Sequence, residues 1–204
     1  MEKFVYTVDS ITAWVGKAFA WCILILTFGV GYEVFVRYVL RNPTSWAFDI
    51  SYMMYGTLFM MAGAYALSRD SHVRGDVFYR LWKPRNQARL EFVLYFLFFF
   101  PGVLALILAG FDYASESWRY KEVSVMSPAG IPIFQFKMVI PVAGALLLIQ
   151  GIAQCCRCIL CMKTGEWPKH LEDVEETETI LQHVHEEGSP ALEVLGLKPG
   201  GDKK

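Results

Sequence analysis

The sequence contains few charged residues. Asp, Glu, Lys and Arg make up 19% of its 204 residues, whereas hydrophobic residues make up 54% and aromatic residues 15%, with a mean hydropathy of +0.33. A water-soluble core of this size cannot bury so much apolar surface. The composition excludes a collagen-like or disordered chain, a disulfide-stapled mini-protein and a typical soluble enzyme. It favours an integral membrane protein.

The sequence also lacks the motifs of common catalytic sites. No G-x-x-x-x-G-K-[ST], H-E-x-x-H or G-x-S-x-G pattern occurs, so neither nucleotide hydrolysis nor a familiar hydrolase is indicated. All four histidines lie outside the long apolar stretches, which removes the paired histidines of a b-type haem bundle; they are His72, His170, His183 and His185. We therefore expect no enzyme activity, no catalytic residue, no cofactor and no metal.

Four long stretches carry no charge at all. They comprise 15 residues between Lys17 and Glu33, 19 between Asp49 and Arg69, 20 between Glu91 and Asp112, and 19 between Lys137 and Arg157. A hydrocarbon core of about 30 Å is crossed by about 20 helical residues. The run from Phe92 to Leu108 is apolar at both odd and even positions, which favours a helix over a barrel strand. The sequence predicts an all-α membrane protein with four transmembrane helices, at about residues 12–36, 48–68, 91–112 and 133–158.

The distribution of charge predicts the orientation. The connection between the second and third stretches holds six basic residues, against two in each of the other connections, which places it and both termini in the cytoplasm. Residues 1–165 carry 15 basic and 10 acidic side chains, a net +5, whereas residues 166–204 carry 4 and 10, a net −6. We expect a membrane domain at 1–163 and a mostly disordered, acidic cytoplasmic tail at 164–204. The first stretch lacks a convincing cleavage site and reads as a retained anchor.

Glycine, proline and tryptophan within the stretches indicate packing rather than chemistry. Glycines seven residues apart share a helix face and allow close helix approach; the candidates are Gly56, Gly63, Gly144 and Gly151. Pro101 and Pro141 should distort their helices. Tryptophans near the ends of the stretches suit the membrane interface; these are Trp14, Trp21, Trp46 and Trp118.

Charged residues at membrane depth are the leading functional candidates. They are Glu33, Asp49, Asp112 and Lys137, each placed near the outer end of a stretch and none near its middle. A proton relay or ion-coupling site would require a carboxylate near the middle. Lys137 is the most embedded, and the alternatives for it are a snorkelling side chain, an ion pair with Asp49 or Asp112, or a contact with lipid phosphate.

Four cysteines cluster near the end of the fourth stretch. Cys155, Cys156, Cys158 and Cys161 form a C-C-x-C-x-x-C pattern that superficially suggests zinc or iron–sulfur binding. On a continuing helix three of them do not converge tetrahedrally, and a reducing cytoplasm disfavours disulfides. Small apolar thiols at the interface are the preferred interpretation. Likewise, topology and anionic headgroups explain the basic middle connection, so we expect membrane lipids as neighbours and no nucleic acid.

The motifs around the second stretch occur in a particular order. Arg-Tyr at 37–38 precedes Asn-Pro-Thr-Ser-Trp at 42–46 and Asp49, and Gly-Ala-Tyr-Ala-Leu at 63–67 precedes the segment at 69–76. That segment contains His72, Arg74 and Asp76, and further along come Ser-Pro-Ala-Gly-Ile-Pro at 127–132, Lys137, Ile-Pro at 140–141 and Gln150. Over about residues 10–160 the chain resembles the small membrane (DctQ-like) subunit of tripartite ATP-independent periplasmic (TRAP) transporters. It departs from that pattern at Phe48-Asp49, where the family has an acidic pair, and in its acidic tail and cysteine cluster.

This resemblance implies a subunit of a sodium-coupled secondary transporter in the bacterial inner membrane. A large multi-span permease subunit would carry the substrate and ion sites, and a periplasmic substrate-binding protein would deliver an organic acid. The small subunit would brace the permease and extend the docking surface for the binding protein, without binding substrate itself. The structural and interface residues implied in this chain are Arg37, Trp46, Asp49, His72, Arg74, Asp76 and Lys137.

Two other classes of protein remain open from the residues alone. A four-helix exporter of the small multidrug type would need a mid-helix carboxylate, and Glu33 lies too near the end of its stretch. A membrane thiol oxidoreductase would need cysteine pairs on the oxidising face, where the connections contain none.

Overall fold

The structure, a computed structural model, describes residues 1–69 and 82–168. Its longest helices are grouped into four candidate membrane spans: Lys3–Tyr38, Ala47–Ser68, Pro84–Tyr120 and Phe134–Thr164. Within the described ranges the only β pairing is an isolated bridge between Val123 and Pro132. The predicted all-α membrane fold with four spanning helices is confirmed.

Each long span except the second is divided into shorter elements. The first consists of α1 (Glu2–Ala20) and α2 (Cys22–Tyr38), and the second is α3 (Ala47–Ser68). The third consists of α5 (Pro84–Leu94), the π-helix η1 (Tyr95–Phe99) and α6 (Phe100–Tyr120). The fourth consists of α7 (Phe134–Lys137) and α8 (Val139–Thr164).

Proline explains two of the three interruptions. Pro101 lacks an N–H group, and its ring would clash with the carbonyl four residues earlier, so the helix widens into η1 immediately before it. Pro141 follows the break between α7 and α8 at Met138 by three residues. The third interruption, at Trp21, has no proline or glycine beside it. The local distortion predicted for both prolines is therefore present.

The helices run beyond the charge-free stretches. At about 1.5 Å per residue, the 36 residues of the first span and the 37 of the third exceed a hydrocarbon core of about 30 Å by several turns. The first begins at Glu2 rather than near residue 12, and the third begins at Pro84 rather than near residue 91. Charge-free length measures the part that lipid can surround, whereas the backbone remains helical as long as its charged side chains find partners or solvent.

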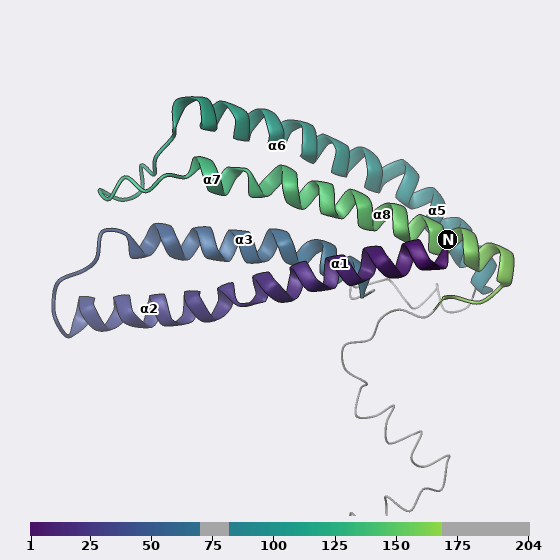
Figure 1. Cartoon of the computed structure of the whole chain (residues 1–204), viewed down its shortest axis with the longest axis horizontal. Helices are drawn as coiled ribbons and strands as arrows, with labels where there is room; N and C mark the ends of the chain where they lie inside the picture. Colours follow the sequence, from purple (N-terminus) through teal and green to yellow (C-terminus); the bar gives the residue numbers. More distant parts are fainter. Residues whose placement is uncertain (70–81, 169–204) are drawn as a thin grey trace, which may run out of the picture. The chain divides into compact units, whose positions relative to one another are not determined.

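Helix α8 lies at the centre of the fold. It packs against α1, α3, α5 and α6, whereas α2 packs mainly against α3 (Figure 1). Accordingly, 44% of the most apolar 18-residue segment of the fourth span is buried inside the protein, whereas the corresponding share is 6% in the first and third spans. The outer helices α2 and α6 therefore present most of their apolar side chains to the surroundings.

The two ends of the helix bundle differ in their contacts. We call one the terminal end, where α1 and α5 begin and α8 ends; here the Cys161 thiol lies 3.7 Å from the carbonyl oxygen of Pro84. We call the other the loop end, formed by the connections at 39–46 and 121–133. The connection at 121–133 reaches across the fold to the start of α3, where the Ser124 hydroxyl donates to Asp49. Helix α8 stops at Gly165, whose positive φ of 88° closes the last turn of the helix at the terminal end.

Candidate partner interface

Asp49 is fully buried in the first turn of α3. Its carboxylate accepts hydrogen bonds from Ser124 Oγ at 2.7 Å and from Ser127 Oγ, both in the connection at 121–133. A carboxylate in the first turn also complements the helix dipole. One carboxylate therefore attaches the start of the second span to the loop between the third and fourth.

Lys137 ends the short helix α7, and its side chain is only 9% exposed. Its ammonium pairs with the Glu122 carboxylate and lies 3.9 Å from the centre of the Tyr113 ring. Of the alternatives left open for Lys137, an ion pair is present, but its partner is Glu122 rather than Asp49 or Asp112. The loop backbone folds back so that Ile133 N–H donates to the carbonyl of Glu122 at 3.1 Å, which brings Glu122 to Lys137.

The Lys137–Glu122 pair should stabilise the loop end at neutral pH and be lost in acid. The Lys137 ammonium holds the pKa of Glu122 below its usual 4.5. Because folding favours the ionised carboxylate, this stabilisation is complete above the unfolded-state pKa and is lost as the pH falls through the lower folded-state pKa. The melting temperature of the wild type in detergent should exceed that of Glu122→Gln by a constant amount between about pH 6 and 8, and the difference should shrink below about pH 4. A difference that is unchanged in acid would show that the charge of Glu122 is not its source.

Glu33 links the end of α2 to the connection that follows it. One carboxylate oxygen accepts from Arg37 Nε at 2.9 Å and Nη2 at 2.6 Å, while the other accepts from the backbone N–H of Thr44 at 3.2 Å and from its hydroxyl. The indole of Trp46 stacks on the Tyr32 ring, with centroids 6.3 Å apart. Arg37 and Trp46 remain 52% and 41% exposed, so both can also contact another protein.

The terminal end contains a buried polar network that the sequence did not predict. Arg157 of α8 pairs with Asp9 of α1, and Gln150 Nε2 donates to the same carboxylate at 2.8 Å. Thr12 Oγ1 donates to Gln150 Oε1 at 3.0 Å, and Arg157 Nη1 donates to Gln154 Oε1 at 3.0 Å. All five side chains are at most 3% exposed.

A sequence signal for this network exists. Asp9 and Thr12 are three residues apart, and Gln150, Gln154 and Arg157 follow at intervals of four and three, so each set lies on one helix face. Polar residues at helical spacing, next to apolar stretches, indicate a buried pairing between two helices. Of the five, only Gln150 was singled out from the sequence, through the family resemblance.

The four glycines chosen from the sequence lie where α3 and α8 face their neighbours. A Cβ at Gly56 would come within 2.6 Å of Phe136, one at Gly144 within 2.7 Å of Ile107, and one at Gly151 within 2.3 Å of Phe99. At Gly63 the nearest atom, of Leu147, would be 3.8 Å away, an ordinary contact. Three of the four positions thus exclude any side chain unless a neighbour moves.

Two of the four cysteines of α8 lie against α5. Cys158 and Cys161 are completely buried beside Ala88, whereas Cys155 and Cys156 are half-buried. In residues 1–69 and 82–168, no disulfide joins the cysteines, and no three His, Cys, Asp or Glu side chains converge as a metal site would need. Three further candidates, His72, Arg74 and Asp76, lie outside the described residues.

These features define a multi-pass membrane protein in which the buried polar side chains at each end of the fold bind one another. Comparison with known protein families identifies which family this is. Residues 9–161 match the family model described as tripartite ATP-independent periplasmic transporters, DctQ component. The chain therefore belongs to this family and is a small subunit of a TRAP transporter. No curated protein matches the chain.

Proposed function

We propose that this subunit braces the large permease subunit and helps to dock a periplasmic substrate-binding protein during ion-gradient-driven uptake of an organic acid. The observation that carries the proposal is that the buried charged side chains bind partners within the chain itself. Asp9, Arg157, Asp49 and Lys137 are buried and have partners within the chain, which suits a rigid brace better than a transport pathway. Sodium coupling and substrate binding are assigned to the partner subunits.

The exposed faces of the outer helices support an interface with a large membrane partner. Helix α2 exposes Phe28 and Phe35, which lie seven residues apart on one face, and Gly31 between them has no neighbouring atom within 4 Å of its Cβ position. A small residue between two large ones lets another helix approach closely. We place the permease on this side of the subunit.

The loop end is assigned to the periplasm and the terminal end to the cytoplasm of a bacterial inner membrane. The basis is the positive charge of the connection between the second and third spans, which is joined to the terminal end through α5. In this orientation Arg37 and Trp46 face the binding protein, whereas Asp49 and Lys137 hold the loop in shape. His72, Arg74 and Asp76 are assigned to the cytoplasmic face of the interface through the family resemblance.

The experiment is co-purification of the large subunit with a tagged small subunit. Asp49→Ala should release the Ser124 and Ser127 hydroxyls, loosen the connection at 121–133, and reduce both the yield of complex and the uptake of a labelled organic acid severalfold. Arg37→Ala should lower uptake more than complex yield, because its guanidinium is half exposed. The matched control is Glu116→Ala, which removes an exposed carboxylate of α6 near the loop end.

Full retention of the complex and of uptake in both variants would refute these assignments. The purified subunit alone in vesicles should transport nothing. Solute flux from that preparation would instead support the stand-alone exporter, and thiol trapping of a redox-active cysteine pair would support the oxidoreductase.

A further inference from the structure

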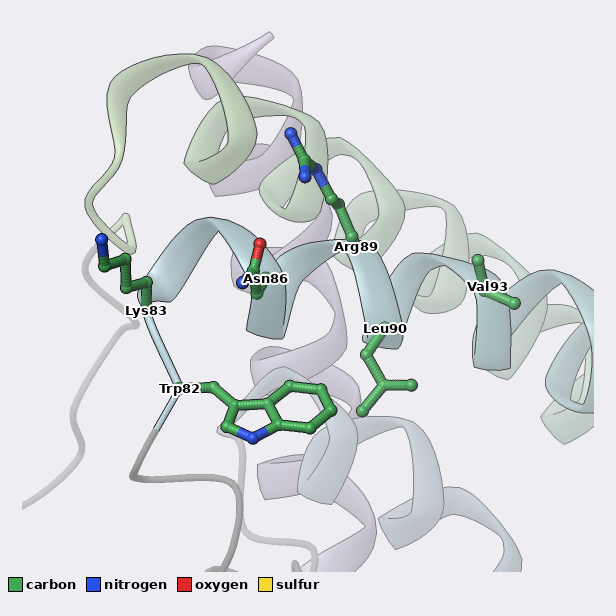
Figure 2. A pocket seen from close by; sticks show the side chains of 6 residues that line it. All are labelled: Trp82, Lys83, Asn86, Arg89, Leu90 and Val93. Atoms are coloured by element: carbon green, nitrogen blue, oxygen red, sulfur yellow. The ribbon is translucent and has the colours of Figure 1, made fainter.

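A groove follows one side of α5 at the terminal end, with a volume of about 660 Å³. It is lined by Trp82, Lys83, Asn86, Arg89, Leu90 and Val93 (Figure 2). The volume lies within the range of small-molecule sites. Since these residues recur at intervals of three and four, they form one continuous surface along about three helical turns.

The chemistry of the groove changes along the helix. Lys83, Asn86 and Arg89 supply two cations and an amide near the start of α5, whereas Leu90 and Val93 continue toward the apolar part of the span. The two cations lie about 9 Å apart along the helix axis, at about 1.5 Å per residue. A ligand that matches this order has an anionic head and an apolar tail.

The groove faces away from the protein. On the opposite side of α5, Ala88 packs against Cys158 and Cys161 of α8. Trp82 is held in place because Gln87 Nε2 donates to its carbonyl oxygen at 3.0 Å, yet half of its side chain remains exposed. An indole at the boundary between a polar and an apolar surface is typical of the membrane interface.

The two cations are available for an anion. In residues 1–69 and 82–168, no carboxylate forms a salt bridge with Lys83 or Arg89, and no carboxylate lines the groove. The nearby Glu91 points toward α8 instead, where its carboxylate lies 3.8 Å from the Cys158 thiol. Positive charge without a counter-charge beside apolar surface attracts acidic phospholipid.

We propose that this groove is a binding site for one anionic phospholipid, with its phosphate between Lys83 and Arg89 and an acyl chain along Leu90 and Val93. The site requires only that α5 meets the membrane surface, so it stands independently of the proposed function. The lipid would hold the start of the third span at a fixed depth.

The test is native mass spectrometry of the full chain in detergent, titrated with phosphatidylglycerol or phosphatidylcholine. One phosphatidylglycerol should bind in preference to phosphatidylcholine. The double variant Lys83→Gln/Arg89→Gln should weaken that binding about 10- to 30-fold, because each cation near the surface contributes to the attraction. The control Arg119→Gln/Lys163→Gln removes two exposed cations elsewhere and should bind as the wild type does.

Four outcomes would overturn the proposal. Equal binding of both lipids, or equal loss in both double variants, would indicate general attraction to a cationic protein. Full displacement of the lipid by millimolar inorganic phosphate would indicate a phosphate site without acyl-chain recognition. A further experiment needs no variant: photoactivatable phosphatidylglycerol should cross-link to residues 82–93 of the wild-type protein. Cross-links confined to other helices, or to a co-purified permease, would show that the lipid does not occupy this groove.

Discussion

Arg157→Ala should lower the free energy of unfolding by about 3–5 kcal/mol, the largest effect we expect from a single substitution. The change removes the guanidinium that pairs with Asp9. The Asp9 carboxylate then stays buried, at 3% exposure, with the amide donor Gln150 Nε2. A buried charge that loses its partner retains the full cost of its desolvation. Reversible unfolding by SDS in mixed micelles, followed by circular dichroism, measures the loss.

A double variant separates charge from packing. Asp9→Leu/Arg157→Met removes both charges while keeping apolar volume, and it should recover most of the stability lost in Arg157→Ala, because replacing a buried pair with hydrophobic side chains is often neutral. As a matched control, Arg119→Ala removes an exposed arginine at the far end of α6 and should change stability by less than about 0.5 kcal/mol. Equal, large losses in the double variant and in Arg157→Ala would show that the shape of these side chains matters more than their charge.

Gly151→Ala should destabilise the contact between α8 and the π-helix η1 by about 1–3 kcal/mol. The added methyl group would lie 2.3 Å from Phe99 Cε1. The Phe99 ring cannot move freely, since it contacts the rings of Tyr95 and Phe100, at centroid distances of 5.0 and 5.8 Å. The thermal midpoint of the purified subunit in detergent should fall.

Gly63→Ala provides the matched control on the neighbouring helix. Its methyl group would meet Leu147 at 3.8 Å, which is ordinary van der Waals contact, and alanine is a better helix former than glycine. The thermal midpoint should stay the same or rise slightly. If both alanine variants melted at the same temperature, close approach at Gly151 would not contribute to stability.

The spanning helices could be predicted because their signal is local. A run such as the 20 residues between Glu91 and Asp112 has only one favourable arrangement in lipid, whatever the other helices do. The start of the helix at Glu2 could not be found in this way. Most of its first two turns are exposed, and the turn that follows is buried through the contact of Asp9 with Arg157, which lies 148 residues further along the chain.

The partner of Lys137 likewise depends on contacts between separate segments rather than on local sequence. The sequence left three alternatives for Lys137, and the ion pair was considered only with Asp49 or Asp112, the carboxylates near the ends of other stretches. The two serines of the connection instead satisfy Asp49, and the folded loop supplies Glu122. The loop's course depends on backbone turns at positive φ, at Lys121 and Gly130, which the charge pattern does not specify.

The link between Asp9 and Arg157 also sets an order of events during biosynthesis. The first helix leaves the ribosome with an acidic group whose basic counterpart has yet to be translated, and at about 5–20 residues per second the delay is about 7–30 s. Until then the nascent chain must keep Asp9 in water or within the insertion machinery. A chain truncated before α8 would therefore carry Asp9 without its basic partner.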